Sequence, residues 1–194
     1  ANVANGRVEK VAADISQLRA AARQIASYLK DNHKKAFAHE GILRLSGNQN
    51  DRIRLYNEIT QSPEKTQLPA LDKSIDAVLV AALFKEVYRD MNLFGSTEEL
   101  KMAFEQIAEG LQGLDKEKQK QEIITSLQAL IDKLGPEEKE DLRAYLEILV
   151  LVQQQESTNL MGFKNLAIVA GPNLMIDKET SLEEQVQKTP MINN

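Results

Sequence analysis

The chain has 194 residues and a formal charge of −5 at pH 7, from 24 Lys and Arg against 29 Asp and Glu. This acidic balance disfavours a nucleic-acid partner, because nucleic-acid-binding domains ordinarily carry a clear basic excess. The sequence contains no cysteine, which excludes disulfides, thiolate nucleophiles and cysteine-ligated metals.

The first predicted element is a long amphipathic helix that begins near Val8 and ends near Asn32. Its apolar residues recur at alternating intervals of three and four, which places them on one stripe of a helix. They are Val8, Val11, Ile15, Leu18, Ala22, Ile25 and Leu29. Such a stripe suits either a helix packed on its own domain or a coiled-coil seam. We expect the first.

A loop and a second helix follow the long helix. Two glycines, Gly41 and Gly47, mark the loop. A helix is predicted from about Gln49 to Thr60, and its inward-facing residues are Ile53, Tyr56 and either Ile59 or Leu55. The stretch 61–73 contains two prolines and is predicted to be a connection.

Three further helices are predicted before residue 135. Ser74 is expected to cap a helix over 74–91. The next covers 97–110, and acidic residues in its first turn favour the positive end of the helix dipole. The third covers 115–134, and we expect Gly135 to end it as a C′ residue.

The remaining sequence predicts three more helices. Pro136 suits the first turn of a helix that extends to about Val152. Another is predicted over 160–170, and the capping box Ser181-x-x-Glu184 begins the last. Good helix formers dominate the composition and no stretch alternates long enough for a strand. We therefore expect an all-α, single-domain bundle of about eight helices over 1–194.

Few side chains suggest catalysis within this chain. His33 and His39 lie near one loop without metal-ligand spacing or an acidic partner, so we interpret them as solvated loop residues. Ser46 lacks the G-x-S-x-G context of a nucleophile. The longest apolar stretch, 77–84, is too short to span a bilayer. Neither a metal site nor a transmembrane segment is predicted.

Arg44 is a charged residue inside an apolar run that is bracketed by two glycines. The glycines indicate a loop. Its neighbours Ile42, Leu43 and Leu45 are expected to anchor the loop to the core and leave the guanidinium projecting. Arg44 could instead cap a helix C-terminus or pair with a core acid, and composition alone favours that interpretation.

Three separated segments, taken together, resemble the signature motifs of one family. They are E-G-I-L-R-L-S-G (40–47), L-F-K-E-V-Y-R-D (83–90) and T-N-L-M-G-F-K-N-L-A-I-V-A-G-P-N-L-M (158–175). They resemble, in order, the motifs E-G-I-F-R-x-S-G, L-K-x-x-L-R-E-L-P and N-K-M-x-x-x-N-L-A-I-V-F-G-P-N-L of the Rho GTPase-activating, or RhoGAP, domains. The resemblance covers roughly 25–191, and 1–24 are expected to form an N-terminal helical extension.

The resemblance implies a domain that binds a GTP-loaded Rho- or Rac-type small GTPase and speeds its GTP hydrolysis. Such a domain is not itself an enzyme with a complete active site. It has no cofactor, since GTP and Mg²⁺ belong to the partner. Arg44 aligns with the arginine finger, which meets the negative charge of the transferring phosphoryl group. A cytoplasmic location is expected, with membrane recruitment through regions outside this chain.

Five other residues align with functional positions of the family. The resemblance implies that Lys85 contacts the GTPase near its switch regions and that Arg89 braces the finger loop by hydrogen bonds. Asn165 is expected to help order the finger loop and touch the switch surface. Asn159 and Asn173 match asparagines near that surface, or serve only as a helix N-cap and a turn residue.

Some positions depart from the family pattern. Asp-Met-Asn-Leu at 90–93 replaces E-L-P-x-P-L, Leu160 stands where the motif has lysine, and Ala170 replaces a phenylalanine. These changes leave two alternatives open. One is a GTPase-binding scaffold of the same fold with little stimulation, and the other is a helical adaptor that binds a peptide in an apolar groove. The presence of Arg44 favours the activator.

Overall fold

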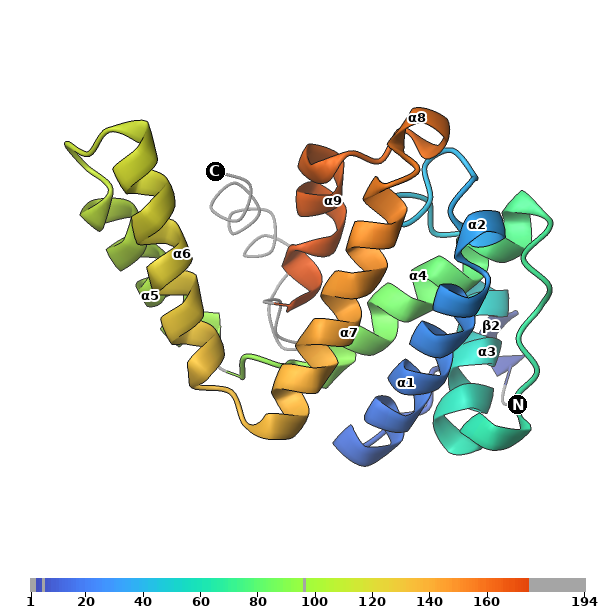
Figure 1. Ribbon diagram of the computed structural model, residues 1–194. Helices are drawn as coiled ribbons and strands as arrows, with labels where there is room; N and C mark the ends of the chain where they lie inside the picture. Colours follow the sequence, from blue (N-terminus) through green and yellow to red (C-terminus); the bar gives the residue numbers. More distant parts are fainter. Residues whose placement is uncertain (1–2, 5, 96, 175–194) are drawn as a thin grey trace.

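The structure is a computed structural model that describes residues 3–4, 6–95 and 97–174 (Figure 1). Its described elements, in chain order, are β1 (Val3–Ala4), β2 (Arg7–Val8), α1 (Ile15–Asp31), α2 (His33–Ala36), α3 (Gln49–Gln61), η1 (Pro63–Lys65), α4 (Ser74–Met91), α5 (Thr97–Gly110), α6 (Lys116–Asp132), α7 (Pro136–Gln153), α8 (Glu156–Asn159), α9 (Phe163–Ala170) and η2 (Pro172–Leu174). Helices dominate, which confirms the all-α prediction. Across this part of the chain, every helix is too short or too polar to cross a bilayer.

Helix α1 begins at Ile15, so the prediction of a helix from Val8 is wrong. The start is set by a capping box in which the Asp14 carboxylate accepts the Gln17 backbone N–H at 2.8 Å. In return the Gln17 side chain accepts the Asp14 N–H at 3.0 Å. Residues 9–14 form neither helix nor strand. Among the described residues of the expected helical extension over 1–24, the helix begins only at Ile15.

Helix α4 forms the middle of the core. Most of its residues are buried, including Phe84 and Tyr88, as expected for a helix with apolar residues on several sides. Tyr145 of α7 stacks on Phe84 with ring centroids 5.5 Å apart. The Tyr88 hydroxyl donates a hydrogen bond to the Asp141 carbonyl at 2.8 Å. These contacts fix α7 against α4, and α1 and α3 also pack on α4.

The α5–α6 hairpin lies to one side of the helices that surround α4 (Figure 1). Ile131 and Leu134, at the end of α6 and just beyond it, pack against the core. Gly135 was expected to end α6 as its C′ residue, and this prediction is wrong, since α6 ends at Asp132 with Lys133 as its C-cap. Gly135 is the N-cap of α7 with φ −68° and ψ 168°. The following Pro136 explains this, because a residue before proline is restricted to extended backbone.

Two other predicted helix starts differ from the structure. Lys73 is the N-cap of α4, and Ser74 is the first helical residue. The helix predicted over 160–170 starts at Phe163, because Leu160 takes a left-handed conformation with φ 60° between α8 and α9. The capping box predicted at 181–184 lies outside the described residues.

Candidate functional site

Arg44 belongs to the loop that joins α2 to α3 and lies on the protein surface. Ile42 and Leu43 are both fully buried, as predicted, and Arg44 is exposed. The prediction for Leu45 is wrong, since its side chain is 45% exposed instead of anchored. None of the ion pairs within the described part of the chain involves Arg44. A permanently charged group is thus presented to the solvent by two buried neighbours.

The backbone of this loop turns sharply at Gly41 and Leu43. The Arg44 and Leu45 N–H groups both donate to the Gly41 carbonyl, at 2.9 and 3.0 Å. Leu43 has φ 69°, a left-handed conformation that costs a non-glycine residue about 1–2 kcal/mol. Burial of its side chain holds it there. A Cβ on Gly41 would lie 3.1 Å from Nη2 of Arg44, so glycine leaves room for the guanidinium.

Asn159 supports the first half of the loop from inside the protein. Its side chain is fully buried and donates to the Phe37 and Val152 carbonyls, both at 2.8 Å. Its Oδ1 accepts the Met161 N–H at 2.8 Å, and its own carbonyl accepts the Gly41 N–H at 2.9 Å. Figure 1 accordingly shows the α2–α3 loop beside α8. Asn159 is the last residue of α8, so the interpretation as a helix N-cap is wrong, and its role near the switch surface stays a prediction.

Arg52 holds the second half of the loop and was missed by the sequence analysis. Its Nη1 donates to the Ser46 carbonyl at 3.0 Å, and its Nε donates to Glu86 Oε2 at 2.9 Å. Arg89 was expected to make this type of contact. It instead pairs with Glu86 at 3.5 Å and with Asp90 at 3.9 Å. One sequence signal could have pointed to this role of Arg52. The residue lies in α3 directly before Ile53, which was predicted to face inward.

A small hollow beside the loop brings several predicted residues together. It has a volume of about 110 Å³ and is lined by Ser46, Arg52, Ala82, Lys85, Glu86, Arg89 and Asn173. Burial, followed by the charges of Arg89 and Arg52, lowers the pKa of Lys85 from 10.5 to about 8. Three cations with one carboxylate make the hollow suitable for an anionic group of a partner.

The remaining predicted asparagines stabilise the turns around α9. Asn165 is exposed and donates to the Leu160 carbonyl at 2.9 Å. Asn173 donates to the Val169 carbonyl at 3.0 Å while also lining the hollow. Leu160 and Phe163 are 54% and 66% exposed, so this turn also presents apolar surface.

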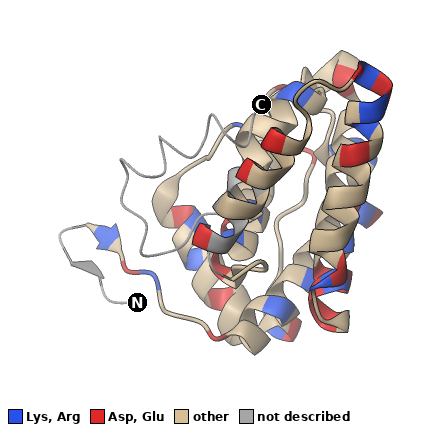
Figure 2. Ribbon diagram, turned by 90° about the vertical axis from the view of Figure 1, so that its left-hand side faces the viewer, with Lys and Arg blue, Asp and Glu red and all other residues tan. Residues whose placement is uncertain are grey.

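Each of the two histidines has a ring nitrogen within hydrogen-bonding distance of a backbone carbonyl. A ring nitrogen of His33 is 2.8 Å from the Lys30 carbonyl, and one of His39 is 3.3 Å from the Leu71 carbonyl. Among the residues that the structure describes, no group of three or more potential metal ligands occurs. In the view of Figure 2, basic and acidic residues of the described chain alternate along the helices.

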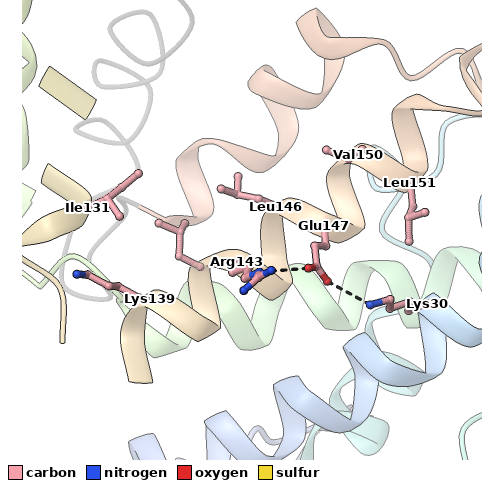
Figure 3. A pocket seen from close by; sticks show the side chains of 9 residues that line it. Lys30, Ile131, Lys139, Arg143, Leu146, Glu147, Val150 and Leu151 are labelled. Carbon is pink, nitrogen blue, oxygen red and sulfur yellow. Dashed lines mark hydrogen bonds and ion pairs between the residues drawn. The ribbon is translucent and has the colours of Figure 1, made fainter. Parts of the chain in front are cut away.

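A larger, aliphatic groove lies elsewhere, along α7, with one lining residue each from α1 and α6. Its volume is about 460 Å³, and its lining residues are Lys30, Ile131, Lys139, Leu142, Arg143, Leu146, Glu147, Val150 and Leu151. Figure 3 shows Glu147 between Arg143 and Lys30, with ion pairs of 3.5 and 3.4 Å. None of the predicted site residues lines this groove.

Comparison with known sequences gives a consistent match. The family model of the RhoGAP domain matches residues 8–179. Rho GTPase-activating protein gacN of Dictyostelium discoideum is 32% identical over 168 residues, which cover 86% of this chain and 25% of that protein. Rho GTPase-activating protein 68F of Drosophila melanogaster is 34% identical over 148 residues, or 75% of this chain and 28% of that protein. The chain therefore spans about a quarter of the length of these relatives.

Solved structures show the same fold. The crystal structure of human Rho GTPase activating protein 15 matches with a TM-score of 0.63 and 23% identity, covering 89% of this chain and 78% of that one. The BH domain from GRAF, the GTPase regulator associated with focal adhesion kinase, matches with a TM-score of 0.66 and 16% identity, covering 92% and 89%. At these identities the likeness concerns the fold alone.

Proposed function

Because this chain belongs to the RhoGAP domain family, we propose that it stimulates GTP hydrolysis by a GTP-loaded small GTPase of the Rho or Rac type. The names of the relatives support this class of activity and partner. The catalytic centre then belongs to the partner GTPase, which also supplies GTP and Mg²⁺. The domain contributes a surface and a side chain.

Arg44 is the side chain that completes the partner's catalytic centre in this proposal. Phosphoryl transfer spreads negative charge over the γ-phosphate and leaving oxygens, and a guanidinium meets that charge with a rigid fork of N–H donors. Such a finger typically contributes roughly 10³ to 10⁵ in rate, or about 4 to 7 kcal/mol of barrier. The observation that carries the proposal is an exposed arginine, without an ion pair to the described residues, on a loop held at both ends.

The hollow beside the loop supplies binding. Lys85 is half-buried beside Arg52 and Arg89, so a carboxylate of the partner would relieve repulsion among these cations. The Arg89 side chain is 42% exposed and can reach the same partner group. Lys85 and Arg89 are therefore binding residues in this proposal, together with the exposed turn that carries Asn165.

The test is a phosphate-release assay on a panel of Ras-superfamily GTPases, with and without this chain. We expect stimulation of at least one Rho- or Rac-type member. Arg44→Ala should lower that stimulation roughly 10³-fold or more, because the transition-state charge loses its counter-charge. Binding to the GTP-loaded partner should stay within a few-fold of the parent value.

Arg143→Ala is the matched control, because Arg143 is an exposed arginine that lines the distant groove. It should stimulate like the parent. If Arg44→Ala also stimulates like the parent, the finger assignment is wrong. If the parent chain binds a GTP-loaded member without stimulating any, the scaffold alternative replaces the activator.

A further inference from the structure

The segment that precedes α1 lies along α3 and is held there by side-chain amides. Asn50 and Asn57 are seven residues apart and therefore share a face of α3. Each amide both donates to and accepts from the backbone of the segment, as a neighbouring strand would. The bonds are Val8 N–H to Asn50 Oδ1 (3.1 Å), Asn50 Nδ2 to the Gly6 carbonyl (3.1 Å), Val11 N–H to Asn57 Oδ1 (2.8 Å) and Asn57 Nδ2 to the Glu9 carbonyl (2.9 Å). The register of residues 6–11 on α3 is thereby fixed.

This register places the Lys10 side chain beside two acidic side chains of α4, Glu86 and Asp90. Its Nζ lies 3.1 Å from Glu86 Oε1 and 2.6 Å from Asp90 Oδ2, and 4.4 Å from the centre of the Tyr56 ring. The acid side chains are only 9% and 4% exposed. Two carboxylates one helical turn apart repel each other when they are shielded from water, so both need nearby cations. Lys10 is one of them.

Arg52 links Glu86 to the loop that carries Arg44, because it bonds to both. The guanidinium is planar, so a bond from Nε to Glu86 and another from Nη1 to the Ser46 carbonyl fix its plane and its direction. Ser46 is two residues beyond Arg44. Asn159 holds the other end of the loop through Gly41. Removal of the Arg52 bond would therefore free the half of the loop that follows Arg44.

We propose that Arg52 is a positioning residue for the Arg44 loop, and that Lys10 supports it through Glu86. The connected contacts run from Lys10 to Glu86, from Glu86 to Arg52, and from Arg52 to the Ser46 carbonyl. The pre-α1 segment thus belongs to the machinery that places the finger. The importance of this placement for GTP hydrolysis rests on the proposed function.

Amide hydrogen exchange, followed by mass spectrometry of peptides covering 42–48, tests the inference without any partner. In Arg52→Ala, exchange in this loop should be faster by about ten- to a hundredfold, because a bond donated by a charged group is lost. Arg54→Ala is the matched control, since Arg54 lies on the same helix and its one ion pair with a described residue is a surface pair with Asp51 at 3.4 Å. It should leave the loop unchanged. Lys10→Ala should give a smaller increase in the same peptides.

Arg52→Ala leaves the buried Glu86 carboxylate without its arginine, which could cause misfolding. A second variant therefore controls for this effect. In the double variant Arg52→Leu, Glu86→Leu both charges are replaced by apolar groups of similar size, which buried pairs often tolerate. Lys10 keeps Asp90 as its partner. The loop of this folded variant should again exchange faster. Exchange at the parent rate in both Arg52 variants would overturn the inference.

The activity readout separates positioning from general stability. On a GTPase that the parent stimulates, Arg52→Ala should lower the maximal rate about tenfold or more, and it should weaken binding to the GTP-loaded partner by a clearly smaller factor, since Arg52 also lines the hollow. An equal loss of both would overturn the positioning role. If the parent stimulates no GTPase, the proposed function fails, and hydrogen exchange alone decides whether Arg52 holds the loop.

Discussion

At the scale of single residues, the loop separates the exposed Arg44 side chain from the residues that hold the loop. Arg44 is exposed, and Leu43 beside it is buried in a left-handed conformation. Asn159 and Arg52 fix the two halves of the loop through backbone carbonyls and amides. An arginine on a loop that is held in this way would lose less conformational freedom on entering a partner's active site. Such preorganisation favours catalysis.

Lys85 gives a prediction of pH dependence. Its pKa is about 8 in the folded chain, below the ordinary value of 10.5, because of burial and of Arg89 and Arg52; Glu86 is the acid facing the same hollow. Between these pH values the unfolded chain binds more protons than the folded one, so this residue's contribution to stability rises with pH. Lys85→Met should be more stable than the parent at pH 7.5, and the advantage should shrink by about 2 kcal/mol at pH 10.

The measurement is urea unfolding of both proteins at the two pH values. A second pair, the parent and Lys35→Met, serves as the control because Lys35 is an exposed lysine paired with Asp72. A Lys85→Met advantage that is the same at both pH values would show that the Lys85 amine is not held near its neutral state.

The residues that the sequence revealed and those that it did not differ in the kind of partner they have. Arg44 and Lys85 were found because they belong to motifs. Asn159 and Arg52 were not assigned their supporting roles, because they bond backbone carbonyls, which are chemically alike at every position. Asn159 and Phe37 are 122 residues apart, and the carboxylate that orients Arg52 is 34 residues away. Single-sequence patterns contain no record of such pairings.

At the scale of elements, local capping decided where helices begin. The apolar stripe of α1 continues back to Val8, yet the capping box at Asp14 and Gln17 starts the helix at Ile15. The stripe alone therefore overestimated the helix. Most other helix bounds were predicted closely, because α3, α4, α5 and α7 combine a long apolar period with clear ends. Gly135 was misassigned because Pro136 restricts the backbone of its neighbour more strongly than a helix end favours a left-handed glycine.

The cap of α1 gives a prediction for stability. Asp14→Ala should lower the free energy of unfolding by about 1 kcal/mol, because the first turn loses a side-chain acceptor. Asp31→Ala, at the opposite end of the same helix, should have no effect or stabilise slightly, since an acid there opposes the helix dipole. Urea unfolding monitored by circular dichroism measures both. Equal losses from the two substitutions would contradict the assigned start of α1.

At the scale of the whole molecule, α4 connects the core to the loop that carries Arg44. Phe84 and Tyr88 pack into the aromatic cluster with Tyr145, whereas Glu86 and Asp90 pair with cations near the surface. This largely buried helix thus carries the carboxylate that orients Arg52. The fold class followed from the helical period of the sequence. The meeting of the pre-α1 segment, α3 and α4 at one charge network is a tertiary arrangement that periodicity does not encode.

Binding of the domain to its GDP-loaded partner, with and without aluminium fluoride, tests the central claim most directly. Aluminium fluoride beside GDP mimics the transferring phosphoryl group, and mimics of a transition state bind more tightly when the catalytic groups are in place. We predict that aluminium fluoride strengthens binding of the parent domain to the GDP-loaded GTPase by about a hundredfold or more. Arg44→Ala should lose most of this gain while it still binds the GTP-loaded form. A gain of the same size in Arg44→Ala would contradict the role of Arg44 as the finger.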